Sequence, residues 1–154
     1  MQISLSQWLA GRRTFCVLTL ATCFGMGTGD VHAQAWDGPW AGEYSCSEVL
    51  FRPQTSRSPH KFSVPVDVMV AGRQIRGVRE TEKTLERIQG KITLPGSASI
   101  TIEGHWKDTG NSWRTSLEGS GDSQSLDLSG PLQSLDGRIT YRRCTLKLKP
   151  VPVP

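Results

Sequence analysis

The sequence predicts an all-β fold, an antiparallel up-and-down meander of about eight strands closed as a small barrel. Glycine and proline are frequent, with 16 Gly and 9 Pro in 154 residues, which suits short strands joined by tight turns better than a helical bundle. From residue 36 onward, apolar residues recur at every second position, as they do along half-buried strands. Cys46 and Cys144, near the two ends of this region, are placed to join the first strand to the last.

Residues 1–35 have the pattern of a cleaved secretory signal peptide. Arg12 and Arg13 supply a basic start, and the apolar stretch after them is too short to span a bilayer. Small residues then mark two cleavage points, after Ala33 and after Ala35. We therefore expect a periplasmic or secreted protein whose mature chain has no transmembrane segment.

Cleavage changes the cysteine count, because Cys16 and Cys23 lie in the signal peptide. The two cysteines that stay, Cys46 and Cys144, are expected to form a disulfide in an oxidising compartment. Two separate buried thiols are the alternative. A different export route is a lipid anchor through Cys23, since the four residues that end there resemble a lipoprotein box.

The mature chain is expected to contain one β domain over residues 36–149. It is followed by a loose proline-rich tail at 150–154, which cannot pair as a central strand. Within the domain, two prolines and several Ser and Thr residues predict a long polar loop at 52–60.

Alternation is clearest at 62–70, where Pro65 requires an edge, a bulge or an outward-directed N–H because proline cannot donate to a ladder. Alternation and turn residues together predict eight strands, at 40–47, 61–71, 73–79, 84–94, 98–107, 112–120, 123–130 and 138–149. The apolar spacing over 78–88 also suits a short amphipathic helix, so that segment has two interpretations.

A weak internal repeat consists of an aliphatic residue, any residue and then glycine. It contains Gly77, Gly90, Gly104, Gly119 and Gly130, at intervals of 11 to 15 residues. One strand and a turn fit that interval, whereas a strand and a helix do not. Glycine weakens a strand unless the sheet bends there or a neighbour packs over it, so the repeat favours a strongly curved sheet.

Two motifs mark the ends of the domain, D-G-x-W-x-G-x-x-x-C at 37–46 and R-x-C-x-L-x-L at 142–148. With the glycine-punctuated strands between them, they resemble a group of small exported bacterial proteins of unknown function. The resemblance covers most of the mature chain. It implies no activity, because no activity is established for the group. The sequence departs from the group's pattern at Pro39, where Thr or Arg is more usual.

Gly38 and Trp40 on the first strand, with an arginine on the last, are more loosely similar to calycin-type barrels, the lipocalins and biotin-binding barrels. In that architecture the tryptophan closes one end of the barrel and the arginine stacks on it. The similarity implies that Trp40 is a structural plug and that Arg142 or Arg143 packs on its ring. An architectural analogy of this kind implies no function.

Aromatic residues are the candidate site. Trp40, Tyr44, Trp106 and Trp113 share the alternation face of the aliphatic core. They either line a cup for a small apolar ligand or complete a packed core, and we favour the core. The charged residues between 73 and 87 are expected to form a solvent-exposed hairpin.

The sequence contains neither H-E-x-x-H nor G-x-S-x-G, and its cysteines lack metal-ligand spacing, so we predict no metal, no cofactor and no enzyme activity. The net charge of +4 is too small and dispersed to indicate a nucleic-acid partner. We expect a non-enzymatic exported barrel that binds a small ligand or a cell-envelope component. The alternative is a protein-interaction module, such as a periplasmic protease inhibitor that uses the loop at 52–60.

Overall fold

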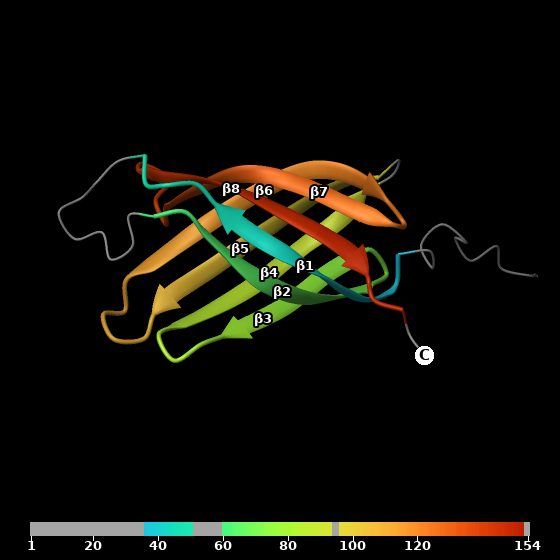
Figure 1. Cartoon of the computed structure of the whole chain (residues 1–154), viewed down its shortest axis with the longest axis horizontal. Coiled ribbons are helices and arrows are strands. Elements are labelled where there is room, and N and C mark those ends of the chain that lie inside the picture. Colours follow the sequence, from blue (N-terminus) through green and yellow to red (C-terminus); the bar gives the residue numbers. More distant parts are fainter. Residues whose placement is uncertain (1–35, 51–59, 94–95, 153–154) are drawn as a thin grey trace, which may run out of the picture.

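The structure is a computed structural model that describes residues 36–50, 60–93 and 96–152. Within these residues eight antiparallel strands follow one another, and the last pairs with the first to close a barrel (Figure 1). The strands are β1 (Gly38–Cys46), β2 (Phe62–Ala71), β3 (Gln74–Glu80), β4 (Thr84–Thr93), β5 (Ser97–Trp106), β6 (Ser112–Asp122), β7 (Ser125–Ser134) and β8 (Thr140–Pro150). The predicted fold class is confirmed. The expected signal peptide, with Cys23, lies outside the described residues, as does the loop expected at 52–60 apart from His60.

The helix considered over 78–88 is wrong. β3 ends at Glu80 and β4 begins at Thr84, so the segment is the end of one strand, a short turn and the start of the next. The turn is held by the Thr81 N–H, which donates to the Thr84 carbonyl oxygen at 2.9 Å. Pairing with neighbours on both sides of β4 outweighs the local helical spacing.

The last strand runs slightly further than expected. β8 includes Pro150, which faces Trp40 on β1, and the Val151 N–H then donates to the Pro39 carbonyl oxygen at 2.9 Å. Proline is tolerated there because the ladder ends at that residue. The expectation that the loose tail begins at residue 150 is therefore wrong for Pro150 and Val151, which are joined to β1.

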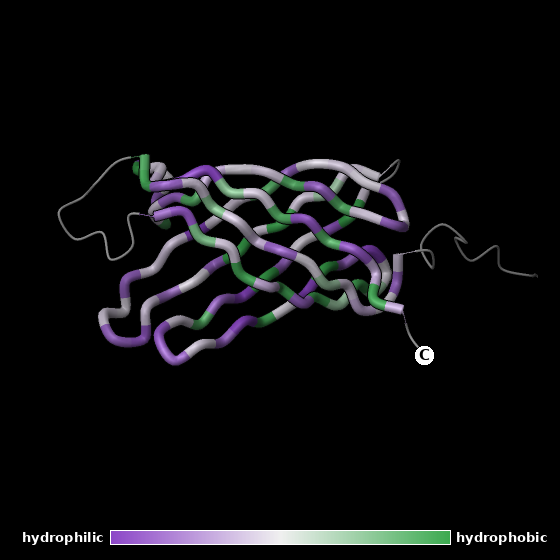
Figure 2. The backbone as a smooth tube through the Cα atoms, in the orientation of Figure 1, coloured by the Kyte–Doolittle hydropathy of each residue, from purple (hydrophilic) through white to green (hydrophobic). Residues whose placement is uncertain are grey.

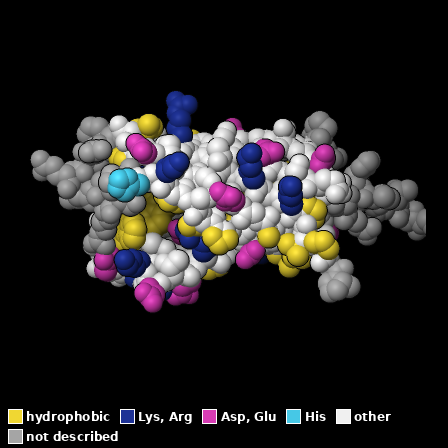
Figure 3. Space-filling view, in the orientation of Figure 1, with side chains coloured by type: hydrophobic (Ala, Val, Ile, Leu, Met, Phe, Trp, Pro, Cys, Tyr) yellow, Lys and Arg dark blue, Asp and Glu magenta, His cyan; other side chains and the backbone are white. Residues whose placement is uncertain are grey.

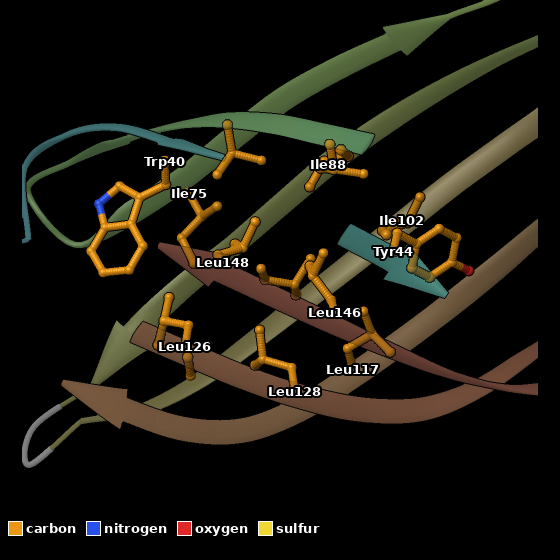
Figure 4. Packing of buried hydrophobic residues seen from close by; sticks show 14 of the residues in the cluster. Trp40, Tyr44, Ile75, Ile88, Ile102, Leu117, Leu126, Leu128, Leu146 and Leu148 are labelled. Atoms are coloured by element: carbon orange, nitrogen blue, oxygen red, sulfur yellow. The ribbon is translucent and has the colours of Figure 1, made fainter. Parts of the chain in front are cut away.

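Every second side chain points into the barrel, and hydrophobic and hydrophilic residues accordingly alternate along the strands (Figure 2). Valine, isoleucine and leucine fill the middle of the barrel, where side chains from opposite walls meet (Figure 4). Ile75, Ile102, Leu126 and Leu146 are completely buried. The centre of the barrel is therefore a packed core, and of the four predicted aromatic residues this core includes Trp40 and Tyr44.

Two tryptophans close one end of the barrel, which we call the closed end. Trp40, at the start of β1, is 1% exposed, and its ring stacks on that of Trp36 at a centroid distance of 5.6 Å. Its indole Nε1 donates to the Trp36 carbonyl oxygen at 2.9 Å. Trp40 thus has both the burial and the position expected of a plug (Figure 4).

The glycines of the repeat lie where neighbouring strands approach each other closely. A Cβ at Gly130 would lie 1.8 Å from the Ser116 carbonyl oxygen, and one at Gly90 would lie 2.4 Å from that of Ser99. At Gly104 the obstacle is instead a side chain, the indole of Trp113. A side chain at any of these positions would push two strands apart or displace an aromatic ring, which gives the repeat its physical reason.

β2 and β3 are joined over the shortest ladder in the barrel. Three residue pairs are in register: Met69 with Arg76, Val70 with Ile75, and Ala71 with Gln74. All three are near the closed end, and from there the two strands diverge towards the other end (Figure 1). We call the space between residues 62–68 of β2 and 77–80 of β3 the β2–β3 opening. Pro65 lies along it, as expected of a residue that cannot donate to a ladder.

Candidate functional site

The end of the barrel opposite the Trp40 plug, which we call the open end, differs chemically from the packed core. The buried polar and charged side chains of the described residues are Thr84, Glu86, Thr115 and Arg142. All four come from the first residues of β4, β6 and β8, which begin at this end. The space-filling view shows a hollow with hydrophobic side chains inside it at the same end, where β2 and β3 diverge (Figure 3).

Arg79 and Glu86 form an ion pair inside the barrel. They are register partners on β3 and β4, and alternation from Ile75 and Ile88 turns both side chains inward. Arg79 Nε donates to Glu86 Oε2 at 3.0 Å, and Nη2 donates to Oε1. The Glu86 side chain is 5% exposed and that of Arg79 is 21% exposed. The guanidinium therefore lies between a buried carboxylate and the β2–β3 opening.

A pair of tryptophans stands beside this ion pair. Trp106, the last residue of β5, and Trp113, near the start of β6, have ring centroids 5.4 Å apart and planes tilted by 47°. Both are half-buried. A Cβ at Gly104 would meet both the Trp113 ring and Glu86 Cγ, so the indole and the stem of the carboxylate lie around the same glycine. The open end thus combines aromatic surface with a buried charge pair.

Tyr44 lies beneath these residues, on the side of the packed core. The Thr115 and Tyr44 hydroxyls hydrogen-bond at 2.7 Å, and Tyr44 donates its proton to Cys144 Sγ at 3.4 Å. The ring of Phe62 meets that of Tyr44 edge-on at 5.9 Å. Burial raises the pKa of Tyr44, with a smaller contribution from the charge of Glu86, so the phenol stays protonated.

Arg142 joins the chain after β1 to the chain before β2. Its Nη1 donates to the carbonyl oxygens of Ser47, at 2.5 Å, and His60, at 2.7 Å. The guanidinium also lies 5.2 Å from the centre of the Phe62 ring. Burial lowers the pKa of Arg142. Arg142 therefore holds Ser47, which follows β1, close to His60, which precedes β2.

The expected stacking of Arg142 or Arg143 on Trp40 is wrong. β1 and β8 are antiparallel, so Trp40 at the start of β1 faces Pro150 at the end of β8, and Cys46 faces Cys144. Both arginines precede Cys144 and belong to the open end. The ring that stacks on Trp40 is that of Trp36.

Arg143 points away from the barrel. It is exposed and borders an open concavity of about 1090 Å³ on the outer face of β1, β2, β7 and β8. Glu43 lies in the same concavity, and the hydrogen bonds that it accepts from Ser63 and, at 3.0 Å, from Ser45 lower its pKa. This surface is rich in hydroxyl groups, and its lining also includes Phe62.

The predicted disulfide between Cys46 and Cys144 is confirmed. The two residues face each other across the β1–β8 ladder, with Cα atoms 4.1 Å apart. Both are buried. The covalent link therefore fastens the closing pair of strands at the open end, opposite the Trp40 plug.

The four aromatic residues predicted as one candidate site are divided among three levels of the barrel. Trp40 plugs the closed end and Tyr44, also 1% exposed, lies under the open end. Trp106 and Trp113 stand at the open end itself. A single apolar cup that runs through the barrel is therefore excluded, because the packed core separates the first of these levels from the last.

Sequence reasoning missed Arg79 and Glu86. Both were placed in an exposed charged hairpin, and that interpretation is wrong for these two residues, although Arg76 and Arg87 are exposed as expected. The signal was present in the alternation itself. Continued from Ile75 through Arg79, the inward face includes an arginine, and the same rule applied to β4 includes Glu86.

Comparisons with models of protein families, with curated proteins and with solved structures find no match. The resemblance of the terminal motifs therefore stays a prediction. Among the described residues, no group of three or more His, Cys, Asp or Glu side chains is placed to hold a metal ion. No helix in the described part of the chain is long and apolar enough to cross a membrane.

Proposed function

We propose that the protein is an exported binding protein that holds one small molecule at the open end of its barrel. The ligand has an apolar part, which contacts Trp106 and Trp113, and a polar part, which reaches Arg79. The observation that carries this proposal is the Arg79–Glu86 ion pair, buried beside half-exposed indole rings at the β2–β3 opening. Mouths of β-barrels are common binding sites for small ligands.

The energetics of the ion pair support a functional role. Removing two charges from water costs several kcal/mol for each ion, and a buried pair often stabilises a fold no better than apolar side chains of similar volume. The middle of the barrel consists of closely packed hydrophobic side chains. A charge pair kept inside such a barrel is better explained by a ligand that uses it than by stability.

Features of the opening favour a small molecule over an added peptide strand. Unpaired strand edges can accept an extended peptide, but Pro65 interrupts the donors of β2 and Asp67 places a charge on the same strand. The opening also narrows to a close approach, since a Cβ at Gly77 would lie 2.8 Å from the Asp67 carbonyl oxygen. The space is a wedge and does not suit a strand.

Export is part of the proposal and has separate support. The residues before Trp36 have the pattern of a signal peptide, and disulfides persist in oxidising compartments. N-terminal sequencing of the exported protein is expected to begin after Ala33 or Ala35. An acylated Cys23 at the mature N-terminus would replace the soluble form with a lipid-anchored one.

The test is native mass spectrometry of the protein purified without denaturation, combined with the double variant Arg79→Met, Glu86→Leu. We expect the native protein to carry one small molecule and the variant to lose it. Because the variant removes both charges together, its free energy of unfolding is expected to stay the same or to rise by about 1 to 4 kcal/mol. A variant that unfolds readily and a native protein without any bound molecule would together contradict the proposal.

A protein partner is the second candidate. The rim of the open end exposes Leu50, Leu135 and Ile139, with exposed fractions of 59%, 48% and 42%. Leu50 is tied to β8 by its N–H, which donates to the Tyr141 carbonyl oxygen at 2.8 Å. If this rim is an interface, replacing the three residues with serine is expected to abolish a specific complex on size-exclusion chromatography and to leave small-molecule binding unchanged.

A further inference from the structure

We infer that the ligand of the open end is an organic anion, whose acidic group is bound by Arg79 and whose apolar body lies against Trp106 and Trp113. The inference rests on the proposed function and names the chemical class of its ligand. Carboxylates, sulfonates and phosphates share the chemistry that Arg79 recognises.

The first argument is the donor edge that Arg79 presents. Its bonds to Glu86 use Nε and Nη2, so Nη1 keeps two N–H donors. Within the part of the chain that the structure describes, no buried side-chain nitrogen or oxygen lacks a hydrogen-bond partner, so Nη1 reaches solvent. β3 has no ladder partner on the β2 side beyond Arg76, so Arg79 lies on the part of β3 that borders the opening.

The second argument is selection by charge. A cationic ligand would meet the guanidinium first, and both oxygens of Glu86 are already engaged with Arg79. A neutral apolar ligand would strip water from Nη1 without replacing its hydrogen bonds, which is unfavourable. An acidic group avoids both costs, because one N–H of Nη1 and the remaining N–H of Nη2 lie on the other edge of the planar guanidinium and can donate parallel bonds to two of its oxygens.

The third argument is the place of the aromatic surface. Trp113 and the stem of Glu86 lie around Gly104, and Trp106 extends the aromatic surface towards the rim. An apolar body held there stays within reach of Arg79, because Arg79 is hydrogen-bonded to Glu86, whose stem lies beside Trp113. Glu86 acts as a positioning residue: it holds the guanidinium by two bonds in one orientation and does not touch the ligand.

The experiment uses three probes with the same naphthalene body and different charges: 2-naphthoate, 2-naphthamide and 2-naphthylmethylammonium. The full-length mature protein is titrated with each, and binding is followed by quenching of tryptophan emission and by calorimetry. We expect saturable binding of the naphthoate, at least tenfold tighter than that of the amide, and the weakest response from the ammonium. Phenyl phosphate and benzenesulfonate then separate the acidic groups that share this chemistry.

The decisive variant exchanges the two charges, Arg79→Glu with Glu86→Arg, and so keeps the ion pair. It places a carboxylate at the opening and a guanidinium behind it, and we expect the order of the acid and the ammonium to invert. Arg76→Met, an exposed arginine on the same strand, is the matched control and is expected to keep the preference for the acid. Circular dichroism establishes that both variants remain folded, and the double variant with Met and Leu serves if the exchange does not fold.

The possible failures are distinguishable. If the amide or the ammonium binds as tightly as the acid, or if the exchanged variant still prefers the acid, the charge inference is wrong while a binding site remains. If none of the probes quenches tryptophan emission and the native protein carries no small molecule, the proposed function itself is wrong.

Discussion

Trp40 and Tyr44 are four residues apart on β1 and equally buried, at 1% exposure, yet their polar atoms are satisfied in different ways. The Trp40 indole bonds to a backbone carbonyl oxygen of a neighbour four residues away and stacks on that residue's ring. The Tyr44 hydroxyl instead joins three strands, because its partners Thr115 and Cys144 lie on β6 and β8. One residue closes an end, and the other ties opposite walls together.

Trp40→Ala is expected to lower stability by about 3 to 5 kcal/mol, because it leaves a cavity under the ring of Trp36 and removes a large buried area. Chemical denaturation followed by circular dichroism measures the change. Trp113→Ala, a half-buried site, is the comparison and is expected to lose less. An unchanged midpoint for Trp40→Ala, with loss of ligand binding, would show that Trp40 belongs to a site and is not a plug.

Tyr44 gives a pH dependence of defined sign. The unfolded phenol ionises near its ordinary pKa of 10.0, whereas burial raises the pKa in the folded state. The contribution to stability is therefore complete below pH 10 and is lost as the pH rises towards the folded pKa, by about 1.4 kcal/mol per pH unit. Tyr44→Phe is expected to remove that slope between pH 10 and 11, with Tyr141→Phe as the control. Parallel slopes for the wild type and Tyr44→Phe would contradict it.

At the residue scale, the sequence predicted the disulfide and the burial of Trp40 but not the partners of the arginines. The disulfide followed from a pair of cysteines near the two ends of the domain, which leaves little choice. The partner of Trp40 was assigned by analogy with other barrels, and it depends on which strand ends meet. Trp36 precedes the first strand and Arg142 lies near the start of the last one, so antiparallel pairing places them at opposite ends of the barrel.

At the scale of the strand, period-two alternation predicted all eight elements, because each has one face in the core. At β3 and β4 the alternation predicted the strands correctly, but the interpretation of their charged residues as solvent-exposed was wrong for two of them. Charged residues were assumed to face water, although the alternation places Arg79 and Glu86 on the inner face. Alternation predicts which face of the strand a residue occupies. Whether a charged residue on the inner face finds an ion-pair partner depends on which residue lies opposite it on the neighbouring strand, and alternation alone does not give that register.

The glycine repeat predicts that replacing its glycines with alanine lowers stability by different amounts, according to how close the added Cβ would lie to a neighbouring strand. Gly130→Ala is expected to destabilise most, since its Cβ would lie 1.8 Å from a backbone oxygen. Gly90→Ala follows, with 2.4 Å, and Gly77→Ala is expected to cost least, with 2.8 Å. Thermal unfolding midpoints of the three variants measure the order.

The matched control for this series is Ser129→Ala, an exposed neighbour of Gly130 on β7, which is expected to change stability by less than about 0.5 kcal/mol. Equal midpoints for all four variants would show that the repeat does not mark close approaches of strands.

At the scale of the whole molecule, the disulfide closes a ring across 98 residues and fastens β1 to β8. Cys46→Ala with Cys144→Ala is expected to cost about 4 to 5 kcal/mol, according to the chain-entropy account of such a ring. That is comparable to the whole stability of a domain of this size. Urea denaturation of the double variant and of the reduced wild type measures it, and non-reducing peptide mapping identifies the linked pair. Unchanged midpoints in both would contradict the expectation.

The short β2–β3 ladder also determines how the barrel comes apart. In a meander the seam between the first and last strands is normally the weakest, but here a covalent bond locks it, and the three-residue ladder becomes the line of least protection. Native-state hydrogen exchange is expected to show β3 opening at a lower free energy than β5 and β6. The barrel would then open into one continuous sheet with β2 and β3 at its two edges, while β1 and β8 stay joined at its interior.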